Sequence, residues 1–132
     1  MFLLDTNACI RILNGSCDRL IKNIRGQSPA DIRLCAISKA ELLYGARHSA
    51  NAAANLRLLE QFFAPFLSLP FDDGCAEICG RIRAELAASG KPIGPYDLQI
   101  AATALANNLT LVAHNTREFL RVAGLRLIDW ES

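Results

Sequence analysis

Four oxygen-bearing side chains stand where the sequence passes from an apolar run into a polar or helical segment. Asp5 and Asn115 each come just after a short apolar run. Glu41 and Asp97 each fall in the first turn of a predicted helix. Because ligands of open α/β sheets bind beyond the carboxyl ends of the strands, we expect these oxygen atoms to gather at one edge of a sheet.

Carboxylates gathered in one place need a counter-charge. They repel one another, which raises their pKa values and costs stability unless a cation lies among them. Oxygen ligands suit Mg²⁺ or Mn²⁺, and the sequence has no His/Cys cluster of the kind that zinc prefers. Since Mg²⁺ usually binds a few carboxylates together with substrate phosphates, the pattern predicts a phosphate-bearing substrate.

Each acid also has a purely structural explanation. Asp5 is placed to cap a helix, and Asp97 to complement a helix dipole. Ser38 and Glu41 fit the capping box S-x-x-E. These roles account for each acid alone, but they do not explain why all of them fall on one side of the predicted sheet.

The elements that would position these residues alternate along the chain. Apolar runs typical of strands occupy residues 2–4, 32–37, 66–70, 109–113 and 125–128. Helical spacing covers residues 6–24, 38–63, 72–89 and 95–107. This alternation predicts one α/β domain over residues 1–132, a three-layer α/β/α fold with a mostly parallel central sheet of about five strands.

Composition narrows the class of protein. With 132 residues, 52% of them hydrophobic, the chain is the size of one globular domain. No run approaches the roughly 20 apolar residues of a membrane span, and no basic segment precedes an apolar one, so we expect a cytoplasmic protein. Five cysteines without a CxxC pair are expected in the core rather than in disulfides. A net charge of +1 neither supports nor excludes a nucleic-acid substrate.

Several segments, in this order and spacing, are similar to one known family: MFLLDTN, ISKAELLYGA, GPYDLQIAATALA, LVAHNTREF and GLRLIDW. From Met1 to Trp130 the sequence resembles the PIN-domain ribonucleases, and most closely the VapC toxins of type II toxin-antitoxin pairs. The resemblance implies a PIN-like fold and a metal-dependent endoribonuclease that inhibits translation. It also implies that Mg²⁺ or Mn²⁺ activates water to hydrolyse RNA, leaving a 5′-phosphate and a 3′-hydroxyl.

The resemblance also implies the site residues. The family's three acids correspond to Asp5 of DTN, Glu41 of AELLYG and Asp97 of PYDLQIA. Its fourth position, often an acid, falls on Asn115 of HNTREF, an amide that can coordinate a metal but brings no charge. Glu118, three residues further on, is expected to help hold the metal.

Other residues near these motifs are expected to assist. Arg11, Lys39, Arg117 and Arg121 are predicted to contact phosphates, although a solvated surface role stays open for each. A role for His114 as a general acid or base is also left open. Three further side chains are expected to orient the ligands by hydrogen bonds: Thr6, Asn7 and Thr116.

The implied partners are an RNA substrate, such as tRNA, a VapB-like antitoxin and a second copy of the chain in a homodimer. The antitoxin tail is expected along grooves between helices. The apolar helix faces at residues 10–13, 20–24 and 56–63 are the predicted walls, and ordinary core packing is their alternative role.

Two alternative functions stay open. One is a PIN-domain nuclease that serves RNA processing, or whose complex binds DNA as a regulator. The other is a receiver-like Mg²⁺-binding signalling domain, which shares the small α/β fold. A receiver needs a phosphorylatable Asp after a central strand and a Lys after a late one, and the runs 66–70 and 109–113 are not followed by such residues.

Overall fold

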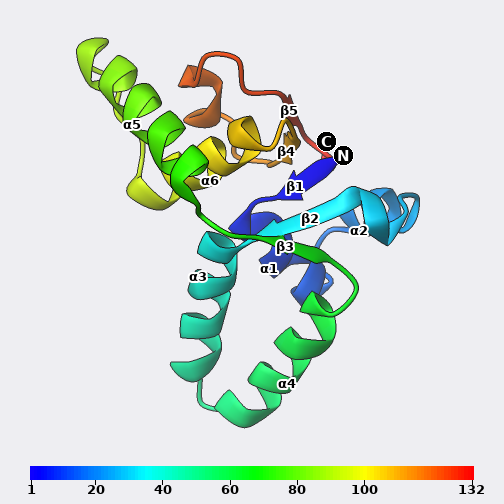
Figure 1. Ribbon diagram of the computed structural model, residues 1–132. Helices are drawn as coiled ribbons and strands as arrows, with labels where there is room; N and C mark the ends of the chain where they lie inside the picture. Colours follow the sequence, from blue (N-terminus) through cyan, green and yellow to red (C-terminus); the bar gives the residue numbers. More distant parts are fainter.

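The computed structural model describes residues 1–132 and contains one parallel sheet with helices on both faces (Figure 1). All neighbouring strands are parallel, in the order β3-β2-β1-β4-β5. The strands are β1 (Phe2–Leu4), β2 (Ile32–Cys35), β3 (Leu67–Leu69), β4 (Thr110–Val112) and β5 (Leu127–Ile128). The predicted three-layer α/β/α fold with five strands is confirmed.

Helices connect the strands and cover the sheet. The α-helices are α1 (Thr6–Asn14), α2 (Asp18–Arg25), α3 (Ala36–Arg47), α4 (Ala52–Phe63), α5 (Asp73–Ala88) and α6 (Pro95–Ala106). Two short 3-10 helices are η1 (Pro29–Asp31) and η2 (Phe119–Arg121). None of the helices combines the length and apolar character that crossing a lipid bilayer requires.

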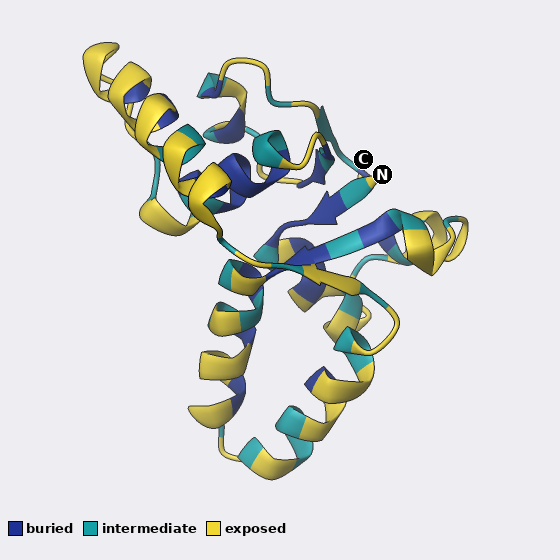
Figure 2. Cartoon of the chain, viewed as in Figure 1, coloured by how far each residue is buried: buried dark blue, intermediate teal, exposed yellow.

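The sheet separates two hydrophobic cores. Successive residues of a strand point to opposite faces, so each strand contributes to both cores. Leu3 and Leu111 pack on the side of α5 and α6, whereas Leu4 and Val112 pack on the side of α1 to α4. Figure 2 shows β1 and much of α6 buried, while most of α5 is exposed. A sheet covered on both faces explains why the central strands are continuous apolar runs.

Two long segments with helical spacing each form two helices. Gly15 ends α1 in the left-handed conformation, with φ of 63°, so residues 6–24 divide into α1 and α2. Residues 38–63 divide in the same way into α3 and α4 around the turn at residues 48–51. The glycine and polar residues at these turns outweigh the helical pattern on either side of them.

Helix α3 begins earlier than its sequence pattern predicts. The strand expected at residues 32–37 ends at Cys35, and Ala36 is already helical. Ser38 and Glu41 therefore lie inside α3, and Glu41 is in its second turn. Their capping-box explanation is wrong, because an apolar run that continues from a strand into a buried helical turn hides the boundary.

The strand order brings the functional segments to one edge of the sheet. The order reverses at β1, with β2 on one side and β4 on the other, and such a switch point opens a crevice at the carboxyl ends of the strands. Asp5 directly follows β1, and its backbone N–H donates to the Val112 carbonyl of β4 at 3.1 Å. The segments that follow β4 and β5 begin at the same edge of the sheet, because these strands are parallel to β1.

We expect Leu111→Ala to lower the free energy of unfolding by about 3–5 kcal/mol, because Leu111 is fully buried between β1 and β5 and its truncation leaves a cavity. Urea unfolding followed by circular dichroism measures the change. Leu67→Ala on the edge strand β3 is the matched control, since Leu67 is 59% exposed. Equal losses in the two variants would contradict the placement of the core.

Candidate active site

Asp5 both caps α1 and presents a buried carboxylate. The residue is 4% exposed, and its Oδ1 accepts a hydrogen bond from the Ala8 N–H at 2.7 Å. Burial, with smaller contributions from the charges of Asp97, Glu131 and Glu41, raises the pKa of Asp5 to about 7 against the lowering effect of the Ala8 N–H. Capping therefore explains why Asp5 stands at the start of α1. It does not explain why this buried carboxylate lies near other acids, where a cation would stabilise its charge.

Asp97 approaches the same space from α6. It lies in the first turn of that helix, as its sequence pattern predicts. Burial is the main cause of its raised pKa, and the charge of Glu118, a side-chain hydrogen bond with Glu118 and the charge of Glu41 add to it. The structure thus brings Glu118, just before η2, against Asp97.

Glu41 reaches the site from α3 and is held by hydrogen bonds. The Thr6 hydroxyl donates to Glu41 Oε1 at 2.8 Å and lies 3.1 Å from the hydroxyl of the buried Ser38. Thr6 follows Asp5 directly, so this contact ties the first turn of α1 to α3. The Thr6 hydroxyl thus makes a hydrogen bond with Glu41, and Ser38 belongs to the same network instead of capping a helix.

Asp5, Glu41 and Asp97 face one another without closing into a tight cluster. Their charges raise the pKa values of Asp5 and Asp97, yet their ligand atoms do not all lie within 4.8 Å of one another. Ligands bound directly to Mg²⁺ at about 2.1 Å can be no more than about 4.2 Å apart. This spacing therefore fits an ion that one or two acids bind directly and the others bind through water, as is usual for Mg²⁺.

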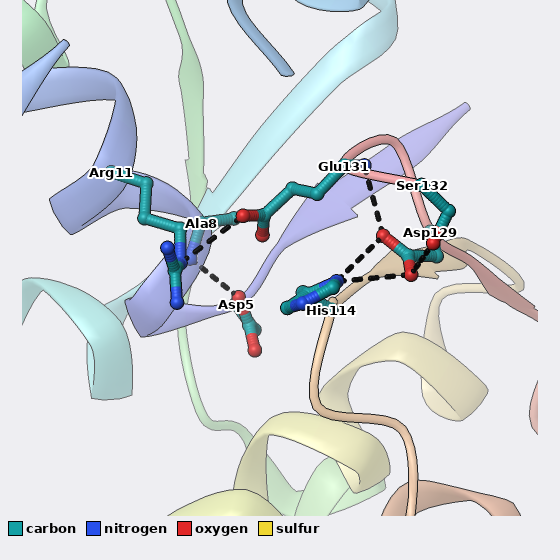
Figure 3. A network of polar contacts seen from close by, with 7 residues as sticks. All are labelled: Asp5, Ala8, Arg11, His114, Asp129, Glu131 and Ser132. Atoms are coloured by element: carbon teal, nitrogen blue, oxygen red, sulfur yellow. Dashed lines mark hydrogen bonds and ion pairs between the residues drawn. The ribbon is translucent and has the colours of Figure 1, made fainter. Parts of the chain in front are cut away.

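A second polar cluster lies beside Asp5, where the chain turns after β5 (Figure 3). Nδ1 of His114 lies 3.0 and 3.2 Å from the two carboxylate oxygens of Asp129, and the Glu131 N–H donates to Asp129 at 2.9 Å. Partial burial raises the pKa of Asp129, but hydrogen bonds from Ser132, the Glu131 N–H and His114 hold it below its ordinary value.

Sequence reasoning missed this C-terminal cluster. His114, Asp129 and Glu131 are the only group of three metal-ligating side chains whose ligand atoms all lie within 4.8 Å of one another. Their hydrogen-bonding groups are largely engaged with one another and with Arg11, which explains the cluster without a metal. The signal was nonetheless present, because Asp129 follows a strand directly, just as Asp5 does.

The four basic side chains that were predicted to contact phosphates differ in whether they already bind other groups of the protein. Nε of Arg11 pairs with Glu131 Oε1 at 3.1 Å. Arg121 donates to a backbone carbonyl at 2.9 Å, and the Lys39 ammonium lies 4.7 Å from the centre of an aromatic ring. Arg117 is exposed and makes no salt bridge. Arg11 is therefore the basic side chain that the structure links to the acidic site.

An apolar groove opens beside the acids. It has a volume of about 420 Å³, lies between α1, α3 and α4, and includes Glu41 in its lining. Ile10, Leu13 and Leu58 line it while 39%, 37% and 55% exposed. Residues 20–24 do not line this groove, and their alternative role in core packing is the one observed, since Leu20 is fully buried and Ile24 packs against the core.

Comparisons with known proteins identify the family. A model of the PIN domain matches residues 2–125. The tRNA(fMet)-specific endonuclease VapC of Shigella flexneri is 38% identical over 129 residues, which cover 98% of this chain and 97% of that protein. The chain belongs to the PIN-domain family.

Comparison with solved structures narrows the identification within the PIN-domain family. The crystal structure of DNA-bound VapBC from Salmonella typhimurium matches with a TM-score of 0.92 and 37% identity, covering 98% of this chain and 97% of that one. VapBC2 from Rickettsia felis, bound to a promoter DNA fragment, matches with a TM-score of 0.92 and 34% identity, covering 98% of each chain. The predicted resemblance to VapC-type ribonucleases is confirmed, and the receiver-like alternative is excluded.

Without metal, we expect the protein to lose stability as the pH rises from about 4 to about 7. Folded Asp5 keeps its proton to about pH 7, whereas the unfolded chain releases it near its ordinary pKa of 3.8. In this window the folded state binds more protons than the unfolded state, so the free energy of unfolding falls with pH, by about 4 kcal/mol at most.

Urea unfolding in EDTA between pH 4.5 and 8 measures this loss. Asp5→Asn is expected to flatten the profile, because the amide oxygen still accepts from the Ala8 N–H but carries no charge. Mg²⁺ should stabilise the parent protein above pH 7 and have little effect on the variant. Parallel pH profiles for the two proteins would contradict the assignment.

Proposed function

We propose that this chain, acting as one PIN domain over residues 1–132, is a metal-dependent endoribonuclease and the toxin of a VapBC-type pair that inhibits translation. One observation carries the proposal. Asp5, Glu41 and Asp97, from three separate elements, come together at the switch point of the sheet, where burial and neighbouring charge raise the pKa values of Asp5 and Asp97. A divalent cation relieves that cost, and the oxygen-only donor set suits Mg²⁺ or Mn²⁺.

The acids are proposed to hold such an ion in different ways. Asp5 and Asp97 are the proposed direct ligands, since their pKa values are the ones that burial and neighbouring charge raise. Glu41, held by Thr6, would contact the ion through water. Once bound, the ion lowers the pKa of water and stabilises charge on the phosphate oxygens during hydrolysis.

Glu118 is proposed to complete the acidic set. Its carboxyl faces Asp97 closely enough to raise the pKa of that residue through both charge and a hydrogen bond. Asn115, which occupies the family's fourth position, is exposed. We propose that Asn115 ligates or orients water at the rim of the site, while Glu118 supplies the charge that an amide lacks.

The substrate class proposed is structured RNA, and tRNA in particular. A relative that is 38% identical over nearly its full length is a tRNA(fMet)-specific endonuclease. Because the site is acidic, basic groups near it must attract the phosphates; Arg11 is half-exposed beside Glu131, and Arg117, next to Glu118 in the sequence, is exposed.

A VapB-like antitoxin is the proposed partner, since neighbours with TM-scores of 0.92 are VapBC complexes. The groove between α1, α3 and α4 suits an amphipathic tail, and it runs to Glu41. A basic side chain on that tail would enter the acidic pocket and compete with the metal. The antitoxin would then inhibit RNA cleavage by occupying both the groove and the adjoining acidic site.

A homodimer is proposed as the working state. A hollow of about 480 Å³ beside Glu41 is lined by Ile37, Ala40, Tyr44 and Tyr96, and the two tyrosines are 69% and 58% exposed. Large exposed aromatic side chains around an apolar hollow are typical of a protein interface.

A regulatory complex on DNA is a second proposal. Two structural neighbours are VapBC complexes bound to DNA. With a net charge of +1, this chain lacks the basic surplus of a protein that coats DNA, so the antitoxin would carry the DNA contacts.

We expect Asp97→Asn to reduce RNA cleavage by at least about 100-fold, because an electrostatic contribution of several kcal/mol is lost. Cleavage of a tRNA(fMet) transcript in Mg²⁺ measures the effect, and EDTA should abolish parental activity reversibly. Asp73→Asn, an exposed acid in the first turn of α5, is the matched control. Parental activity in Asp97→Asn would remove the proposed mechanism.

Leu58→Glu is expected to weaken antitoxin binding at least about tenfold, because it puts an unpaired charge in the apolar groove. Titration calorimetry with the purified antitoxin measures the dissociation constant. Leu67→Glu, an exposed leucine on β3 that lies outside the groove, serves as the control. Unchanged affinity in Leu58→Glu would show that the antitoxin binds elsewhere.

A further inference from the structure

The C-terminal turn holds a buried carboxylate beside the acidic site. The Glu131 side chain is only 6% exposed. Trp130 before it is buried and packs against Phe2, with ring centres 4.7 Å apart, while Asn23 donates to the Trp130 carbonyl at 3.0 Å. Together with the contacts of Asp129, these interactions fix the turn to β1, α2 and the end of β4. Glu131 is therefore held in place.

Glu131 engages Arg11 through one edge of the guanidinium. Its Oε1 lies 3.1 Å from Nε of Arg11, and the two terminal nitrogens of Arg11 make no hydrogen bond with the protein. The Arg11 side chain remains 44% exposed. The N–H groups of these terminal nitrogens are thus left free on a side chain that Glu131 holds by charge, and such a planar fork matches the geometry of a phosphate.

The pair lies at the catalytic site. Helical side chains lean toward the N-terminus of their helix, so Arg11 reaches back toward the turn that Asp5 caps. Figure 3 shows Arg11 and Glu131 directed toward one another next to Asp5.

A stabilising role explains this arrangement poorly. A buried carboxylate paired with a half-exposed arginine contributes little net stability, because desolvation opposes the attraction. Placing another negative charge near Asp5 adds repulsion to a site that is already acidic. The arrangement does supply what that site lacks for a polyanionic substrate, which is a cation with a defined orientation at its rim.

We propose that Glu131 is a positioning residue that orients Arg11 to bind a phosphate of the RNA substrate beside the catalytic acids. This inference rests on the proposed ribonuclease function and deepens it. Arg11 makes the phosphate contact, and the C-terminal turn becomes part of the substrate-binding site.

The test is steady-state cleavage of a tRNA(fMet) transcript by the full chain carrying Arg11→Ala, Glu131→Ala or both changes. Each single change should raise KM about tenfold, the value of one charge-assisted hydrogen bond, with a much smaller effect on kcat. The double variant should match Arg11→Ala alone, because Glu131 acts only through Arg11. Glu131→Gln, which keeps an acceptor for Nε, should restore part of the lost affinity.

Binding measured in the Asp97→Asn background, where the RNA stays intact, gives a second readout. Removal of Arg11 should reduce the slope of log affinity against log salt by about 0.7, the value for one phosphate contact with single-stranded nucleic acid. Arg81→Ala is the matched control, since Arg81 forms an exposed pair with Glu85 on α5. Parental KM and salt slope are expected for it.

Parental KM and salt slope in Arg11→Ala would overturn the inference, as would additive effects of the two single changes. If Glu131→Ala does not fold, Glu131→Gln and Arg11→Ala still test whether Glu131 positions Arg11 for phosphate binding. A parent protein that fails to cleave the transcript would instead refute the proposed function. Parental cleavage that Asp97→Asn abolishes, with no effect of Arg11→Ala, would refute the inference alone.

Discussion

The burial of the Asp5 carboxylate among other acids is the constraint on which the rest of the site depends. The side chain cannot leave, because its backbone is tied to β4 and its Oδ1 caps α1. Its neighbours come from α3, α6 and the C-terminal turn, and each adds negative charge. Packing of the sheet and helices holds these groups together against their repulsion, so the fold maintains a site that favours a cation.

The position of Glu41 links the proposed active site to the proposed antitoxin-binding groove. Glu41 belongs both to the group of site acids and to the wall of the apolar groove between α1, α3 and α4. A ligand seated in that groove therefore reaches the catalytic acids without any change of fold. The C-terminal turn places Glu131 beside Arg11 of α1. The proposed antitoxin and the proposed RNA thus contact side chains near one set of acids, and α1 contributes to both contacts.

Sequence patterns predicted some of these features and missed others for identifiable reasons. Asp5 and Asp97 were predictable, because the end of an apolar run and the first turn of a helix are local signals. The position of Glu41 within α3 was not, since the apolar run before it crosses a strand and a buried helical turn. The contact of Glu118 with Asp97 was expected only through the family resemblance.

By itself, the sequence determined the alternation of strands and helices and the presence of acids at several strand or helix ends, because both follow from local periodicity and residue type. Only the tertiary structure decided which of these ends meet. Thr6 binds Glu41, and Arg11 pairs with Glu131 from 120 positions away, because the sheet order places β1 between β2 and β4 with β5 beyond. Strand order depends on how whole elements pack together, and no local pattern encodes it.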